Sequence, residues 1–161
     1  MTTSTANTTA RPVLAAGDGL HLGSGPGRDL IFKVTGDDTG GAFDYFTVAV
    51  APKDGPPLHM HHSQAETIHV LKGRFTVRLG DELFQLDEGG FAFLPAGVPH
   101  AFVNLTDEPG ELVIVFAPGG GHRFFEELGP HVRGGERDMA AITATFETHD
   151  MQLLGPPLSA D

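Results

Sequence analysis

Four side chains of this sequence, three histidines and one glutamate, could together hold a metal ion. His59 and His61 are two residues apart, so on an extended strand their imidazoles leave the same face, roughly 6 to 7 Å apart along the chain. Glu66 follows after a short polar segment that could turn the chain into a neighbouring strand, and His100 would supply a third nitrogen. Three neutral imidazoles and a carboxylate suit divalent Fe, Mn, Co, Ni, Cu or Zn, at ligand distances of about 2.0 to 2.2 Å. We therefore predict a divalent transition metal as cofactor.

Two histidines separated by one residue do not by themselves make a metal site, because such pairs also occur on exposed strand ends. The spacing to Glu66 and His100 favours the metal. Strand alternation places His62 and His69 on the outer surface. The other histidines have no partner at ligand spacing and are expected to be solvated: His21, His122, His131 and His149.

The candidate ligands lie within a series of short apolar runs that turn signals separate. Several runs alternate apolar and polar residues, as residues 74–79 do, which is typical of strands with one buried and one solvated face. Strands at this spacing predict an all-β sandwich or barrel. We predict nine of them, over residues 29–34, 43–50, 57–61, 66–71, 74–79, 82–86, 91–94, 99–104 and 111–116.

The pattern changes after residue 116. A proline- and glycine-rich run over residues 117–121 ends the strand series, and we predict a short helix over 122–128 and a longer one over 136–148. These helices are expected to pack outside the barrel or across one of its mouths. The apolar segment 153–158 is expected to dock on the barrel or on a partner subunit.

Composition limits the classes of function. A chain of 161 residues with 40% hydrophobic and 19% charged residues predicts one compact domain. Its net charge of -11 repels phosphate backbones, so we expect no nucleic-acid partner. No run approaches the ~18 apolar residues of a membrane helix, so we expect no membrane partner. The sequence has no cysteine, which excludes thiolate sites and favours a cytoplasmic location.

The spacing of the ligands resembles the two-part signature of the cupin superfamily. The first part is His59, one residue, His61, four residues, Glu66, six residues and Gly73. The second part is Gly89, five residues, Pro95, one residue, Gly97, two residues, His100, three residues and Asn104. The resemblance covers about residues 41–118. One departure is Gly55, which lies only four residues before His59 and indicates an altered entry loop.

The resemblance implies a cupin double-stranded β-helix, a jelly-roll barrel, whose interior binds a metal. We therefore predict a disordered tail over residues 1–11, a single cupin barrel over 12–118, and a helical extension over 119–161 that packs on the barrel. Cupins generally pair through their sheets, so the resemblance also implies a homodimer.

Residues 116–129 are similar to the strand-to-helix exit of bacterial quercetinase-type monocupins. This similarity implies an enzyme, a metal-dependent dioxygenase that binds a flavonol or a similar enolisable aromatic compound together with dioxygen. Glu66 is then the candidate catalytic residue, as a ligand, a proton acceptor or both in turn. The candidate pocket walls are Phe46, Phe75, Phe91, Phe93 and Phe102.

Two other functions are compatible with the same four ligands. The first is an isomerase, cyclase or lyase that uses metal polarisation and Glu66 without oxygen. The second is a non-catalytic protein that binds a small molecule and keeps the metal as part of its structure. A shared fold does not decide between these functions.

Overall fold

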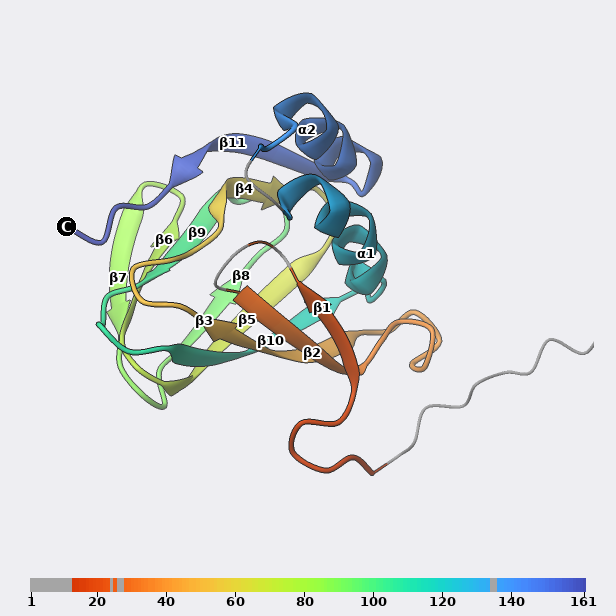
Figure 1. Cartoon of the computed structure of the whole chain (residues 1–161), viewed down its shortest axis with the longest axis horizontal. Coiled ribbons are helices and arrows are strands. Elements are labelled where there is room, and N and C mark those ends of the chain that lie inside the picture. The colour runs from red at the N-terminus through yellow and green to blue at the C-terminus, as the bar shows by residue number, and fades with distance from the viewer. Residues whose placement is uncertain (1–12, 24, 26–27, 134–135) are drawn as a thin grey trace, which may run out of the picture.

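Two antiparallel β-sheets face one another in the computed structural model, which describes residues 13–23, 25, 28–133 and 136–161 (Figure 1). The six-stranded sheet has the order β1-β2-β3-β10-β5-β8, and the five-stranded sheet has the order β11-β4-β9-β6-β7. The strands are β1 (Leu20–Gly23), β2 (Arg28–Val34), β3 (Asp44–Val50), β4 (Pro57–His61), β5 (Ala65–Lys72), β6 (Phe75–Leu79), β7 (Glu82–Leu86), β8 (Phe91–Leu94), β9 (His100–Asn104), β10 (Gly110–Ala117) and β11 (Met151–Pro157). The helices are α1 (Gly121–Val132) and α2 (Met139–Thr148). The tail predicted over residues 1–11 lies outside the described residues.

The predicted fold class is confirmed, and each of the nine predicted strands is present with both ends within one residue of the prediction. The alternation of buried and exposed residues is clearest in β3, where every second side chain points into the barrel. The prediction missed β1 and β11. β1 has only four residues, and β11 ends in two prolines that a strand tolerates because β11 lies at the edge of its sheet.

The core between the sheets consists mainly of aliphatic and phenylalanine side chains. Phe32 stacks on Phe46 with a centroid distance of 4.3 Å, and Phe46 meets Phe116 edge to face at 5.0 Å. A second cluster of buried side chains joins the helices to the last strand: Phe124, Leu128, Val132, Ile142, Phe146 and Met151. The barrel and the C-terminal segment therefore have separate apolar clusters that meet at Phe125, which packs against both.

We predicted a helical extension over residues 119–161, but this segment contains a strand as well as two helices. Its two helices lie side by side over one end of the barrel, and the chain then returns as β11 alongside β4 (Figure 1). β11 pairs antiparallel with β4, with Met151 opposite His61 and Leu153 opposite His59. Among the described residues, no helix has both the length and the hydropathy that a bilayer crossing requires.

His122 is buried, so the prediction that it is solvated was wrong. It is the second residue of α1, with its Nε2 3.3 Å from the Asp37 carboxylate and its Nδ1 3.9 Å from that of Asp44. Asp44 is itself fully buried and accepts hydrogen bonds from the main-chain N–H groups of Gly120 and Gly121 at the start of α1. A carboxylate at this position stabilises the helix N-terminus and ties α1 to β3.

Candidate metal centre

The four predicted ligands come from three strands of both sheets. His59 and His61 lie on β4 and His100 opens β9, all in the five-stranded sheet, whereas Glu66 lies on β5 in the six-stranded sheet. His59 and His100 are direct cross-strand partners. One ligand atom from each of the four residues lies within 4.8 Å of those of the other three. The packing of the two sheets therefore brings the four side chains together.

Glu66 lies at the centre of the cluster. Its Oε2 is 2.9 Å from Nε2 of His100 and 3.2 Å from Nε2 of His61. Glu66, His61 and His100 are each less than 5% exposed, and His59 is half-buried. Water is therefore largely excluded from the space that the four side chains share.

Each of the three histidines makes a hydrogen bond through Nδ1 that sets its ring orientation. Nδ1 of His59 donates to the carbonyl oxygen of Pro57 at 2.8 Å, and Nδ1 of His100 donates to that of Val98 at 3.1 Å. Because a carbonyl oxygen can only accept, the proton must be on Nδ1 in both cases. Nε2 of each ring is therefore the atom presented to the cluster, as in metal-binding histidines whose other nitrogen is fixed by an acceptor.

Gln64 orients the third histidine, and the sequence analysis did not identify it. Its Nε2 donates to the carbonyl oxygen of Pro118 at 2.8 Å, which leaves its Oε1 to accept from Nδ1 of His61 at 2.8 Å. The only sequence signal was its place in the polar segment between the second histidine and Glu66. Its contact with residue 118 is made across 54 positions of the chain and becomes visible only in the fold.

The donor set fits a divalent transition metal. Nε2 of His61 is buried and has no hydrogen-bond partner, although it faces the Glu66 carboxylate. With the proton on Nδ1, this nitrogen turns a lone pair toward a carboxylate oxygen, an arrangement that a cation between the two would stabilise. Three imidazole nitrogens and one carboxylate oxygen are also the ligands that Fe, Mn, Co, Ni, Cu and Zn accept. The cluster could therefore bind a metal.

The pKa values of the cluster describe its metal-free state. Burial, reinforced by His100 and His61, lowers the pKa of His59 to about 3, so this ring is neutral near neutral pH. Burial by itself would raise the pKa of Glu66, but the charge and hydrogen bonds of the neighbouring histidines, chiefly His100, lower it below its ordinary value. Burial likewise opposes the charged form of His100, but the Glu66 carboxylate raises the pKa of His100 above its ordinary value. A proton on His100 therefore neutralises Glu66.

We expect metal affinity to rise with pH because the metal must displace the proton of His100. Below the raised pKa of His100, the apparent affinity should increase about tenfold per pH unit, and above that pKa it should level off. Calorimetric titration of the metal in buffers of different ionisation enthalpy counts the released protons. An affinity that stays constant over roughly pH 5 to 8 would contradict this assignment of the proton.

The metal-free protein should show the opposite dependence. Because folding raises the pKa of His100, the stabilisation from its pairing with Glu66 is complete below the unfolded-state value of about 6.5. That stabilisation is lost as the pH rises through the folded-state pKa of His100. Chemical denaturation of the metal-free protein on both sides of this range measures the loss.

Replacing Gln64 by alanine should lower metal affinity about 10- to 100-fold, because Nδ1 of His61 then loses the acceptor that fixes its ring. The neighbouring exposed residue offers a matched control, since His62→Ala removes a side chain that points away from the cluster. Competition with a chelator of known affinity measures the metal affinity of both variants. If Gln64→Ala binds the metal as tightly as His62→Ala does, Gln64 does not position His61.

An apolar cavity of about 580 Å³ opens onto the cluster. His59, His61 and Glu66 line it, and the almost fully buried His100 lies behind them. Barrel strands form one part of the wall, α1, α2 and β11 form another, and the segments just before β4 and α2 complete it. Of the two placements that we predicted for the helices, the structure shows the one across a mouth of the barrel. Phenylalanines from both parts line the cavity: Phe46, Phe102, Phe116, Phe124, Phe125 and Phe146.

Two of the five phenylalanines that we assigned to the pocket, Phe46 and Phe102, line this cavity. Phe75 does not line it and is fully buried in the core between the sheets. Phe91 and Phe93 are more than half exposed, because both lie on the outward-facing positions of the edge strand β8. These three residues are therefore removed from the predicted pocket wall.

Two phenylalanines contact the candidate ligands directly. The ring of Phe116, at the end of β10, lies 5.2 Å from that of His61, and the ring of Phe146, on α2, lies 5.8 Å edge to face from that of His59. The sequence analysis placed neither residue in the site. Phe146 lies in the helix predicted over residues 136–148 and Phe116 ends the last predicted strand, but neither position indicated a contact with a ligand.

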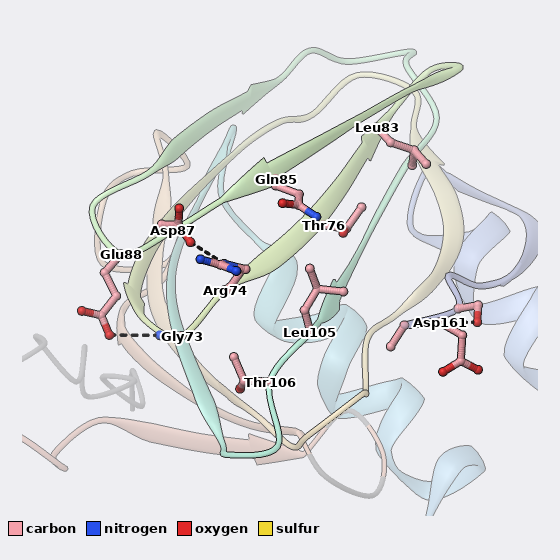
Figure 2. A pocket seen from close by; sticks show the side chains of 12 residues that line it. Gly73, Arg74, Thr76, Leu83, Gln85, Asp87, Glu88, Leu105, Thr106 and Asp161 are labelled. Atoms are coloured by element: carbon pink, nitrogen blue, oxygen red, sulfur yellow. Dashed lines mark hydrogen bonds and ion pairs between the residues drawn. The ribbon is translucent and has the colours of Figure 1, made fainter.

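A larger but open depression lies on the outer side of β6 and β7, away from the cluster (Figure 2). Its volume is about 820 Å³, and the C-terminal Asp161 lies at its border. Arg74 and Asp87 pair there at 2.6 Å, and the Glu88 carboxylate accepts from the N–H group of Gly73. The one arginine that lines the depression is therefore already paired with a carboxylate, and we assign no reaction to this depression.

Comparison with known proteins identifies one family model and several curated relatives. A family model described as a cupin domain matches residues 46–116. A stretch of 88 residues, half of this chain, is 33% identical to a quercetin 2,3-dioxygenase of Bacillus subtilis and covers 26% of that protein. The chain spans between 26% and 58% of the length of the curated relatives that it matches.

Solved structures with low sequence identity have the same fold. An RmlC-like cupin of Shewanella frigidimarina is 16% identical and superposes with a TM-score of 0.59, covering 70% of this chain and 96% of that chain. The structure of KdgF from a Halomonas species is 17% identical and superposes with a TM-score of 0.58, covering 64% and 89%. At these identities the likeness shows the fold alone.

Proposed function

The chain belongs to the cupin superfamily, and from this membership and its four-residue cluster we propose that it is a metal-dependent dioxygenase acting on a flavonol or a similar enolisable aromatic compound. One observation carries the proposal: three imidazoles and a carboxylate converge at an apolar cavity that phenylalanines line. Such a cavity suits a flat aromatic body, and its few polar groups lie where the reacting atoms would be held.

His59, His61, Glu66 and His100 would hold the metal. A bound divalent metal would act as a Lewis acid that makes a substrate hydroxyl more acidic, and it would provide a route for electrons to dioxygen. The phenylalanine walls would hold the aromatic rings and exclude water from the reacting atoms. The cavity therefore separates the substrate from competing hydrolysis.

Glu66 would accept the proton of the substrate hydroxyl. Its Oε2 is the oxygen that contacts His61 and His100, which leaves Oε1 for the substrate. Because the neighbouring histidines hold the pKa of Glu66 below its ordinary value, it is a weak base and accepts a proton only from a strongly acidified hydroxyl. Proton transfer and metal binding are therefore coupled at this residue.

Oxygen consumption tests the proposal. Protein reconstituted separately with Fe, Mn, Co and Ni is mixed with a flavonol, and oxygen uptake is followed with an electrode. Uptake that depends on both metal and flavonol supports the dioxygenase, and its absence with all four metals contradicts it. Turnover without oxygen would indicate an isomerase, cyclase or lyase instead, and binding without turnover would indicate a small-molecule-binding cupin.

We also propose that the protein forms a homodimer through the outer face of the six-stranded sheet. Five large hydrophobic side chains on the strands of this sheet are exposed: Leu20, Tyr45, Leu71, Phe91 and Phe93. Two of them lie on β8, an edge strand whose free side could pair with another chain. Sedimentation equilibrium tests the proposal, and a monomer at all concentrations would contradict it.

A further inference from the structure

Besides the metal cluster, the same cavity has a second group of charged side chains. Arg28 at the start of β2, Asp54 in the loop before β4 and Arg137 before α2 all line it. The Arg28 side chain is only 11% exposed and that of Asp54 29%. The function proposed above does not use these residues.

The charges in this group do not balance. Nε of Arg28 lies 3.1 Å from Oδ2 of Asp54, but both atoms are buried and neither has a hydrogen-bond partner. Among the residues that the structure describes, Arg28 has no other ion-pair partner and Arg137 has none. Two guanidinium groups therefore face one carboxylate, which leaves a net positive charge beside an apolar cavity.

The position of Asp54 is held by the main chain. Its N–H group donates to the carbonyl oxygen of Ala51 at 3.2 Å, and its own carbonyl oxygen accepts from the N–H group of Asn104 at 2.9 Å. The next residue, Gly55, packs so closely on Phe102 that a Cβ atom would lie well inside contact distance of its carbonyl oxygen. Asp54 thus holds Arg28 at a rigid edge of the cavity.

This charge is unusual for the chain as a whole. The sequence has only ten lysine and arginine residues and a net charge of -11, yet two arginines line this one cavity. Burial lowers the pKa of Arg28, Asp54 opposes this effect, and the charge of Arg137 adds to it. An anion between the two arginines would remove their repulsion and supply the missing acceptor.

We propose that Arg28 and Arg137 form a binding site for a carboxylate of the substrate, so that the substrate is an aromatic acid with its enolisable hydroxyl at the metal cluster and its carboxylate at the two arginines. This inference rests on the function proposed above for the location of the reacting hydroxyl. The planar guanidinium of Arg28 can bind a carboxylate through two nitrogens, and the exposed Arg137, just before α2, can bind the same group. Neutral aromatic compounds would then be poorer ligands.

A purely structural role for Arg28 predicts a different outcome. If Arg28 served only to tie β2 to the loop before β4, neither the removal of Arg137 nor that of the Asp54 charge would alter the choice of ligand. If the arginines bind a carboxylate, Asp54 competes with the ligand for Arg28. Asp54→Asn and Arg137→Gln should then change anion affinity in opposite directions.

Binding of two matched probes tests the inference. The probes are a neutral flavonol and the same flavonol with a carboxylate on the ring remote from the enolisable hydroxyl, titrated calorimetrically into the protein as purified. We expect the carboxylated probe to bind about tenfold more tightly at low salt, with the preference weakening as salt is added. Arg137→Gln should reduce the preference several-fold, and Asp54→Asn should increase it. In both variants the affinity of the neutral probe should change less than that of the carboxylated probe.

Arg123→Gln is the control, because Arg123 lies on the exposed side of α1 and pairs with Asp37 at 2.6 Å. It should leave both affinities unchanged. Equal affinities of the wild-type protein for the two probes, or weaker binding of the anion by Asp54→Asn, would overturn the inference. A carboxylate preference without oxygen uptake would refute the dioxygenase but not the binding site. Oxygen uptake with the neutral flavonol, without a preference for the carboxylated probe, would support the dioxygenase and refute the carboxylate site.

Discussion

Replacing Glu66 by glutamine is expected to lower turnover about 100- to 10,000-fold, the range typical for loss of a general base. Glutamine has nearly the same shape, so the packing around position 66 is kept while the negative charge and the proton acceptor are lost. The charge is central to the cluster, because Oε2 of Glu66 contacts both His61 and His100. Metal affinity should also fall, since a neutral amide oxygen is a weaker ligand than a carboxylate.

A second readout separates this effect from a loss of folding. The Glu66 carboxylate is what raises the pKa of His100 in the metal-free protein, so in Glu66→Gln burial should lower that pKa below its ordinary value. Titration of the His100 ring by NMR measures the change. Glu82→Gln on the exposed strand β7 is the matched control and should alter neither turnover nor this pKa. Full activity of Glu66→Gln would show that Glu66 is not the proton acceptor.

Removal of residues 151–161 should abolish tight metal binding, although none of the four ligands is deleted. β11 provides most of the pairing of β4, the strand with His59 and His61, because β4 pairs with β9 only at His59. The deletion also removes Met151, which is 4% exposed and packs with the helices over the cavity. Loss of one such side chain costs about 2 to 5 kcal/mol, which corresponds to a decrease of about 10 °C in Tm.

A shorter deletion provides the control. Removing only residues 158–161 keeps β11 complete and should leave both metal affinity and Tm close to those of the full chain. Chelator competition and thermal unfolding are measured for both truncations. Unchanged metal affinity without residues 151–161 would mean that β9 and the barrel alone hold β4 in place.

The strands and the candidate ligands were predictable because both depend on local spacing. A two-residue period fixes which face a side chain leaves from, so His59 and His61 had to point to the same side and His62 and His69 to the opposite side. The structure places His62 and His69 on the surface, as expected. The short, regular distances between turns likewise fixed the strand ends to within one residue.

Contacts between distant segments were not predictable in the same way. His122 lies on a helix, and its burial depends on Asp37 and Asp44, which precede it by more than 75 residues. β11 contains two prolines and looks irregular, but it is stabilised as a strand because β4 has a free edge beside it. The sequence around β11 does not show that β4 has a free edge, and the sequence around His122 does not show that Asp37 and Asp44 lie beside it.

The period and spacing of the chain were thus enough to establish a β fold with nine of its eleven strands and to select three histidines and a glutamate as candidate metal ligands. The fold in three dimensions decided how those four meet, which phenylalanines line the cavity, that Gln64 orients His61, and that two arginines lie in the same cavity as the ligands. The reason is physical: the direction of a side chain is set by its own backbone, whereas a cavity is set by the packing of segments that lie far apart along the chain.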